Sequence, residues 1–250
     1  VLDERMIRSS EDAFVDRLFD CAPQFGAPFI KAGAPRAYID LNRGAEELDP
    51  ALIEGARRYG HNPRVASGLG VIPRVVANGR AIYRGKLSLK EAQQRLETYW
   101  HPYHTRLRTM LDAAHQYHGQ AILIDCHSMP HEAVETMAGR GLRAPEVVLG
   151  DRFGAAAHSE IVDQIEAAFA GAGFAVSRNT PFAGAYVTQH YGRPSRRQHA
   201  IQIEIDRSLY MDETKIEPHS DFDVFRTRLS GVIGQIAAIG RPEALPLAAE

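Results

Sequence analysis

An apolar run that ends in polar side chains is the first feature of this 250-residue sequence that could carry out chemistry. The run covers residues 121–125, and Cys126, His127 and Ser128 follow its last residue, Asp125. In open α/β sheets, ligands bind beyond the carboxyl ends of the strands. A histidine at such an end can coordinate a metal ion while a nearby acid orients its ring. The pattern is equally typical of a histidine that only hydrogen-bonds a neighbouring loop, so it leaves both alternatives open.

A second candidate is Glu204, which stands in an alternating run. Ile201, Ile203 and Ile205 alternate with Gln202 and Glu204, which is the period-2 pattern of a strand. A carboxylate near a strand end is a good general-base candidate when it lies in a cleft, because partial burial raises its pKa. The alternative is a solvent-facing acid on an edge strand, and the pattern alone favours that alternative.

Two arginines close to an asparagine could bind an anion. Asn42 and Arg43 follow a short strand-like run at 37–41, and Arg36 precedes the same run. The planar guanidinium of an arginine can contact a carboxylate at two points. A surface salt bridge is the ordinary alternative for an arginine.

Two weaker signals remain. The polar stretch from 179 to 194 contains Tyr186, His190 and Arg193, and loops of this composition often form the rim of a binding site. Four histidines recur at i, i+3 spacing within a long helical pattern, but nothing nearby completes a metal site. We interpret them as ordinary histidines on a helix surface; they are His101, His104, His115 and His118.

Cys126 and His127 are adjacent, so on a strand their side chains point to opposite faces and do not form a dyad.

Helices and strands are predicted in alternation around these residues. Helices are expected over 9–26, 88–118, 158–170 and 221–239. Strands are expected over 28–31, 37–41, 121–125, 147–150, 175–177, 186–189 and 200–205, with a hairpin of 75–77 and 81–83. The longest helix should begin at a capping box of Ser88 and Glu91, kink at Pro102 and end at Gly119. This order predicts a layered α/β fold in a single domain, residues 1–250.

Composition narrows the class of protein. The net charge of −2 and a pI near 6.6 give no reason to expect a nucleic-acid or anionic-membrane partner. No stretch is long and apolar enough to span a bilayer, and the two cysteines make no disulfide framework, so we expect a cytoplasmic protein. The stretch 42–73 predicts a long loop, which in a compact domain is usually functional or disordered, and residues from Arg241 onward are predicted to be a loose tail.

Taken together, six motifs resemble the N-formylglutamate amidohydrolase (deformylase) family. They run in order from about residue 10 to residue 213. They are Ser-Glu-Asp-Ala-Phe-Val-Asp at 10–16, Asp-Leu-Asn-Arg at 40–43, Gly-Leu-Gly-Val-Ile-Pro-Arg at 68–74, Asp-Cys-His-Ser-Met-Pro at 125–130, Gly-Ala-Tyr-Val-Thr-Gln-His-Tyr-Gly-Arg-Pro at 184–194 and Gln-Ile-Glu at 202–204. The family is similar in fold to zinc carboxypeptidases and aspartoacylases. The resemblance therefore implies a mixed, mostly parallel central sheet with helices on both faces.

The resemblance also implies a zinc-dependent hydrolysis of N-formyl-L-glutamate to formate and glutamate, as in histidine degradation. His127 and Asp12 would be zinc ligands, with Asp12 favoured over Glu11. Glu204 would be the general base that activates water, and Arg36 would polarise the scissile carbonyl. The remaining residues would bind substrate: Asn42 and Arg43 its α-carboxylate, and Ser128, Tyr186, His190 and Arg193 the rest of the pocket.

One departure from the family concerns the metal. In the family a Pro-His-Ser-Gly segment precedes the first helix and supplies a histidine ligand, whereas this sequence opens at Val1 without such a segment. Catalytic zinc usually has three protein ligands and an open position. We expect either that a natural N-terminus supplies the remaining ligand or that zinc is not held in the family manner. The alternatives in function are a hydrolase of another N-acyl amino acid or short peptide, and a metal-free protein that binds acidic amino acids.

Overall fold

A four-stranded mixed sheet forms the centre of the computed structural model, which describes residues 2–57, 62–135, 137 and 143–240. The strand order is β3 (Ala121–Met129), β6 (Gln198–Asp206), β4 (Val147–Gly150) and β5 (Val176–Arg178). β3 and β6 are parallel, β6 and β4 antiparallel, and β4 and β5 parallel. The sheet is therefore mostly parallel, as expected, and the carboxyl ends of β3 and β6 meet at one edge of it.

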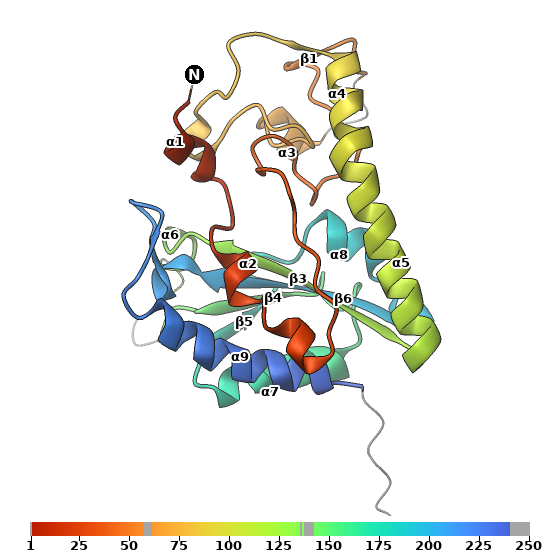
Figure 1. The fold of residues 1–250 in the computed structure, drawn as a ribbon, viewed down its shortest axis with the longest axis vertical. Coiled ribbons are helices and arrows are strands. Elements are labelled where there is room, and N and C mark those ends of the chain that lie inside the picture. Colours follow the sequence, from red (N-terminus) through yellow and green to blue (C-terminus); the bar gives the residue numbers. More distant parts are fainter. Residues whose placement is uncertain (1, 58–61, 136, 138–142, 241–250) are drawn as a thin grey trace, which may run out of the picture.

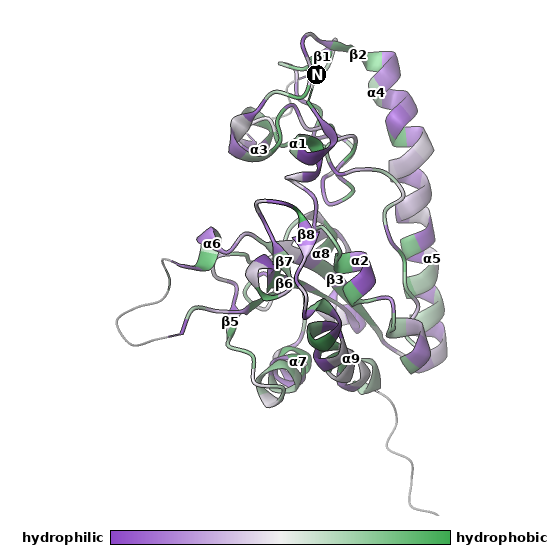
Figure 2. Ribbon diagram, turned by 60° about the vertical axis from the view of Figure 1, so that its left-hand side comes forward, coloured by the Kyte–Doolittle hydropathy of each residue, from purple (hydrophilic) through white to green (hydrophobic). Residues whose placement is uncertain are grey.

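Alternation along the strands gives the sheet two different faces. Ile201, Ile203 and Ile205 point to one face and pack with α7 (Ser159–Gly171) and α9 (Phe222–Ala238) in the main apolar core. Figures 1 and 2 show these two helices together on that side of the sheet. The opposite face is covered by α5 (His101–His118) and α8 (Tyr186–Tyr191). Helices on both faces are confirmed, and Asp125, His127, Gln202 and Glu204 share the second face.

The longest helix runs from Leu89 to His118 in three parts, α4 (Leu89–Arg95), a π-helical turn (Leu96–Trp100) and α5. Its ends lie where predicted, because the Ser88 hydroxyl accepts from Glu91 N and Gly119 adopts a left-handed φ of 70°. The Glu91 carboxylate pairs with Arg95, so the capping box is only half formed. The π turn ends two residues before Pro102, which lacks the N–H that a regular α turn would use. The kink expected at Pro102 stays a prediction.

A second, smaller core lies beside this helix, in the part of the chain where a long loop is expected. Buried apolar side chains there include Ile39, Leu52, Val71, Ile72 and Leu96. The regular structure in this part is short: β1 (Ile53–Glu54), α3 (Pro63–Ala66), η2 (Ala77–Gly79) and β2 (Leu87–Ser88), with β1 and β2 parallel. Figure 1 shows this part above the sheet, next to α4. Packing in this core thus positions the described residues of the stretch 42–73, which the sequence predicts to be a loop.

Several expected elements are wrong. Residues 28–31 and 37–41 form no strand, and residues 186–189 lie in the helix α8. The expected hairpin is reduced to one bridge between Val75 and Ala81. The first helix is reduced to α2 (Val15–Leu18) and η1 (Ala22–Phe25), and Phe14 takes a left-handed φ of 66° directly before α2. The remaining elements are α1 (Glu4–Arg8), α6 (Glu132–Glu135), η4 (Pro194–Arg196), η5 (Arg207–Leu209), β7 (Met211–Asp212) and β8 (Glu217–Pro218). The tail expected from 241 lies outside the described residues.

Among the helices that the structure describes, none combines the length and apolar character needed to cross a membrane.

Candidate active site

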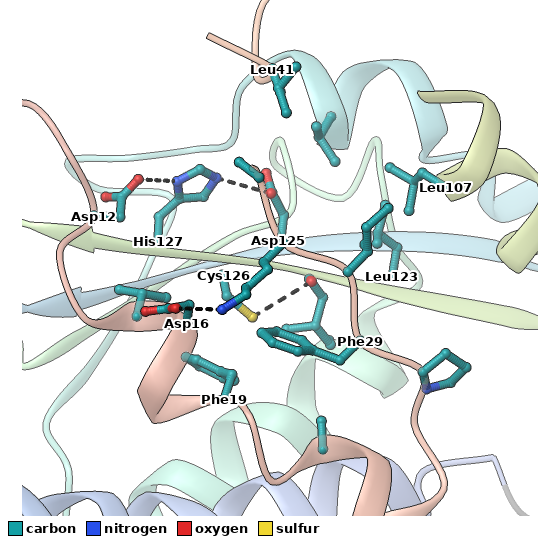
Figure 3. A pocket seen from close by; sticks show the side chains of 18 of the residues that line it. Asp12, Asp16, Phe19, Phe29, Leu41, Leu107, Leu123, Asp125, Cys126 and His127 are labelled. Carbon is teal, nitrogen blue, oxygen red and sulfur yellow. Dashed lines mark hydrogen bonds and ion pairs between the residues drawn. The ribbon is translucent and has the colours of Figure 1, made fainter. Parts of the chain in front are cut away.

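His127 lies between two carboxylates at the carboxyl end of β3 (Figure 3). Its Nδ1 is 2.9 Å from Asp12 Oδ2, and its Nε2 is 3.0 Å from Asp125 Oδ1. Burial alone would lower the pKa of His127, but Asp125 and Asp12 outweigh burial and raise it well above its ordinary value. Cys126 points to the other face, where it packs in the apolar core, and burial raises the pKa of its thiol. The opposite-face expectation for these neighbours is confirmed.

Asp12 reaches the site from the irregular segment before α2. Its Oδ2 accepts from Arg36 Nη1 at 3.1 Å, in addition to facing His127. Burial favours the neutral acid, yet His127 and Arg36 together hold the pKa of Asp12 well below its usual range. Glu11 turns its carboxylate to Arg8 Nε at 3.3 Å instead. Of the two acids considered as a partner of His127, the structure brings Asp12 to it.

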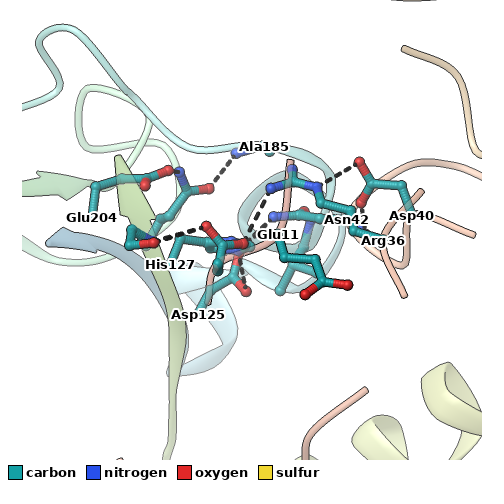
Figure 4. Close-up of polar contacts among 12 residues, drawn as sticks. Glu11, Arg36, Asp40, Asn42, Asp125, His127, Ala185 and Glu204 are labelled. Carbon is teal, nitrogen blue, oxygen red and sulfur yellow. Dashed lines mark hydrogen bonds and ion pairs between the residues drawn. The ribbon is translucent and has the colours of Figure 1, made fainter. Parts of the chain in front are cut away.

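Asn42 connects three parts of the site (Figure 4). Its Nδ2 donates to Asp125 Oδ2 at 3.0 Å and lies 2.9 Å from His127 Nε2. Its Oδ1 accepts from Val187 N, at the start of α8, at 2.8 Å. The amide is therefore occupied with Asp125, His127 and α8, so it braces these groups against one another.

Arg43 is largely buried beside Asn42, with 8% of the residue exposed. Its Nε donates to Leu69 O at 3.0 Å and its Nη1 to Asn42 O at 2.8 Å. Asp40 lies between the two arginines, 3.1 Å from Arg36 Nε and 3.9 Å from Arg43 Nε. Asp40 thus orients both cations, a role that the sequence pattern did not predict for it.

His104 supports the 41–43 segment from α5. Its Nε2 lies 2.9 Å from Leu41 O and its Nδ1 2.9 Å from Tyr191 Oη, while Trp100 Nε1 donates to Arg43 O. The interpretation of His104 as a surface histidine is wrong: 5% of it is exposed. Helical spacing could not reveal this, because the residues that cover His104 come from distant segments.

The burial of His104 predicts a loss of stability in acid. Burial lowers the pKa of His104 from an ordinary 6.5 to about 4, so the unfolded chain binds a proton that the folded chain does not. The buried, neutral His104 contributes on the order of 3 kcal/mol to the free energy of unfolding. This stabilisation is complete above pH 6.5 and is lost as the pH falls towards 4. In urea unfolding at pH 7 and pH 5, His104→Phe should show a smaller difference between the two pH values than the native chain. An equal difference would contradict this assignment.

Glu204 lies on the same face as His127, and the two residues are paired in the β3–β6 register. It is 8% exposed, its Oε1 accepts from Gln202 Nε2 at 2.7 Å, and Gln202 in turn accepts from Ala185 N. Burial raises the pKa of Glu204 to about 7, although His127 and Arg36 oppose the rise. Because β6 is a central strand, the alternative of a solvent-facing acid on an edge strand is wrong.

The four remaining candidates divide into two groups. Ser128 lies in the site, where its backbone N–H donates to Asp12 Oδ1 at 3.0 Å. Tyr186 and His190 stack on α8 with ring centroids 5.0 Å apart, and Arg193 donates to the carbonyl groups of Gln189 and Gly192. Tyr186 and His190 belong to α8, and Arg193 follows it. The helix contacts the site at its start, where Val187 N donates to Asn42 Oδ1.

A cavity of about 810 Å³ opens beside the site. One end is polar and includes Asp12, Arg36, Asn42 and His127. The rest is largely apolar and extends between β3, α5 and the end of α9, as Figure 3 shows in part. It is lined there by residues including Phe19, Phe29, Leu107, Leu111, Ile122 and Ile236. A small molecule could therefore reach the Asp12–His127 pair from a space much larger than a formyl group.

The donors that could hold a metal ion are Asp12 Oδ2 and His127 Nδ1. They face one another at 2.9 Å, and Asp125 supports the far side of the imidazole, which is the arrangement of a carboxylate-oriented histidine ligand. Imidazole nitrogen and carboxylate oxygen are both ordinary zinc ligands. Within the described part of the chain, no group of three or more histidine, cysteine, aspartate or glutamate residues is placed to hold a metal. The site thus offers two suitable donors.

Comparison with known proteins defines the class. The model of the N-formylglutamate amidohydrolase family matches residues 1–211. The chain belongs to this family of amidohydrolases. The similarity of its fold to that of zinc carboxypeptidases stays a prediction.

Three relatives carry the family name more specifically. N-formylglutamate deformylase of Pseudomonas putida is 30% identical over 218 residues, which are 86% of this chain and 76% of the relative. The deformylase of Pseudomonas aeruginosa is 30% identical over 216 residues, 85% and 75% of the two chains. The crystal structure of N-formylglutamate amidohydrolase from Ralstonia eutropha JMP134 superposes with a TM-score of 0.87 at 34% identity, covering 95% of this chain and 86% of that one.

Proposed function

We propose that this chain hydrolyses the amide bond of N-formyl-L-glutamate, releasing formate and L-glutamate, with the help of one zinc ion. Membership of the amidohydrolase family supports the reaction class. The observation that carries the proposal is a buried carboxylate, Glu204, with a pKa of about 7, paired in register with His127. A product of L-glutamate would suit a place in histidine degradation.

Glu204 acts as the general base in this mechanism. A pKa of about 7 lets the carboxylate accept a proton from water near neutral pH and give it up again. Water adds to the formyl carbon as Glu204 takes its proton, the C–N bond breaks, and Glu204 returns the proton to the leaving amine. Gln202 holds one carboxylate oxygen, so the other remains directed for proton transfer.

Arg36 stabilises the negative charge that develops on the carbonyl oxygen. Asp40 raises the pKa of Arg36 more than burial lowers it, and Asp12 adds to the rise, so the guanidinium stays charged throughout. Its position is fixed by Asp40 on Nε and Asp12 on Nη1. A fixed cation that need not reorganise during the reaction is an effective stabiliser of an oxyanion.

Asp12 and His127 would hold the zinc ion. When bound there, zinc would act as a Lewis acid on the carbonyl group and make a neighbouring water more acidic. Asp125 and Asn42 keep the His127 ring in orientation from its Nε2 side. Asp12 and His127 are the two donors that the described residues would supply to it.

Arg43 is assigned to the α-carboxylate of the substrate. A carboxylate that reaches this largely buried guanidinium loses water, so the charge pair is strong and contributes to binding in the ground state as well as the transition state. Arg43→Ala should therefore raise KM for N-formyl-L-glutamate at least 10-fold with a smaller change in kcat. Steady-state kinetics test this, with Arg64→Ala, an exposed arginine of α3, as control. An unchanged KM would place the carboxylate elsewhere.

The function is tested by formate release from N-formyl-L-glutamate together with zinc analysis. We expect zinc bound in stoichiometric amount, turnover that a chelator abolishes and recovery when zinc is restored. Zinc without turnover would move the proposal to another N-acyl substrate. The absence of both zinc and turnover would contradict the proposal. That result would favour a metal-free protein that binds acidic amino acids, and calorimetry with L-glutamate would detect such binding.

The cavity favours one second candidate, a hydrolase of N-acyl amino acids with larger acyl groups. Its apolar part adjoins Asp12 and His127, where the acyl carbon must lie. N-formyl-, N-acetyl- and N-butyryl-L-glutamate should be compared by kcat/KM. Values that fall steeply with acyl length support the deformylase, and values that rise support the second candidate.

A further inference from the structure

Arg207 is a buried cation that the proposed mechanism does not use. It follows β6, three residues after Glu204, and its side chain is 11% exposed. Its closest carboxylate among the described residues is that of Asp12, with Nη2 3.7 Å from Oδ1. That distance is longer than a direct hydrogen bond, so Arg207 makes its close contacts elsewhere.

Those close contacts go to the two residues that flank the Asp12 carboxylate. Nη2 of Arg207 donates to Glu11 O at 2.8 Å, and Nε donates to Ser128 Oγ at 3.1 Å. Nη2 also lies 3.4 Å from Ser128 O. A single guanidinium thus joins the end of β6, the end of β3 and the segment that carries Asp12.

The two oxygens of Asp12 have different tasks as a result. Oδ1 accepts from Ser128 N at 3.0 Å and lies 3.4 Å from Ser128 Oγ, on the side of Arg207. Oδ2 faces His127 Nδ1 and Arg36 Nη1. Asp12 lies between α1 and α2, outside both helices, so no helical hydrogen-bond ladder holds it. Its orientation depends on these side-chain contacts.

We propose that Arg207 is a positioning residue for Asp12, and this inference rests on the proposed function. By holding Glu11 O and Ser128 Oγ, Arg207 keeps Oδ1 turned to Ser128 and Oδ2 turned to His127. Without it, the Asp12 carboxylate can rotate or withdraw, and Asp12 Oδ2 no longer faces His127 Nδ1. Partners of this kind, one step removed from a ligand, typically change metal affinity or activity 10- to 100-fold.

The test compares Arg207→Met with Tyr210→Phe. Tyr210 is a control for general anchoring, because its hydroxyl lies beside the Ser128 side chain and holds the same segment, but donates to Ala13 O at 3.1 Å and not to the Asp12 carboxylate. Zinc affinity is measured by competition with a chromophoric chelator. Steady-state kinetics with N-formyl-L-glutamate give kcat and KM, and thermal unfolding reports on the fold. Arg207→Met should bind zinc 10- to 100-fold more weakly and lose kcat by a similar factor with KM little changed.

Arg207→Lys should recover part of both quantities, since lysine can reach one of the two acceptors but not both. Tyr210→Phe should retain zinc affinity and kcat even if its unfolding temperature falls. Equal effects in Arg207→Met and Tyr210→Phe would overturn the inference and leave Arg207 a general anchor of the segment. A native chain without zinc binding or turnover would instead overturn the proposed function, and the inference with it.

Discussion

Glu204→Gln is expected to lower kcat for N-formyl-L-glutamate by a factor of about 10² to 10⁴, the usual contribution of a general base. The amide keeps the volume of the carboxylate and can still contact Gln202, but it cannot accept a proton from water. Because Glu204 is not one of the proposed metal donors, the zinc content should stay unchanged. Formate release and metal analysis on the same preparation measure both quantities.

The pH profile separates this role from a loss of fold. Glu204 must be ionised to accept a proton, so kcat/KM of the native chain should rise as the pH passes through about 7. The residual activity of Glu204→Gln should lack that rise. Glu146→Gln is a matched control, since Glu146 is a buried carboxylate at the start of β4, paired with Arg143 away from the site. Near-normal turnover in Glu204→Gln would remove Glu204 from the mechanism.

Arg36→Met is the second variant with a large expected effect, a decrease in kcat of about 10² to 10³. The oxyanion exists only as the C–O bond is polarised, so the lost interaction belongs to the transition state and KM should change little. Arg36→Lys should be intermediate, because a single ammonium cannot contact Asp12 and Asp40 and also meet the carbonyl oxygen.

Arg74→Met provides the comparison for Arg36→Met. Arg74 Nε pairs with Asp49 Oδ2 at 2.8 Å in the smaller core, and its side chain is about as exposed as that of Arg36 (36% against 31%). This variant should change the unfolding temperature but leave kcat within about twofold. If Arg36→Met and Arg74→Met affect kcat equally, Arg36 has no direct part in catalysis.

The sequence allowed the strands of the site to be predicted because β6 alternates between apolar and polar residues and β3 is a continuous apolar run. The isoleucines of β6 mark the buried face, so Gln202 and Glu204 must share the other face. The apolar run of β3 likewise ends at Asp125 and His127. Parallel pairing then brings the two strand ends together, as the structure shows.

The rest of the site depends on contacts between distant segments, which local patterns do not encode. Tyr186–Tyr191 could fit a strand or a helix, and its start is held as a helix by Asn42, some 145 residues away in sequence. Arg207 lies three residues after Glu204 along the chain, yet only its contacts with Glu11 and Ser128 give it significance. The expected first helix also begins later than predicted, because apolar periodicity does not reveal the left-handed φ of Phe14.

The residue-by-residue pairing of His127 with Glu204 has a consequence for how activity is lost. Side chains alternate between faces, so a shift of one strand by a single residue would turn its polar groups into the apolar layer beneath α7 and α9. Such a chain would bury charge without a partner and would have no working site. Misaligned molecules should therefore be inactive instead of partly active, and specific activity would count the correctly assembled fraction of a preparation.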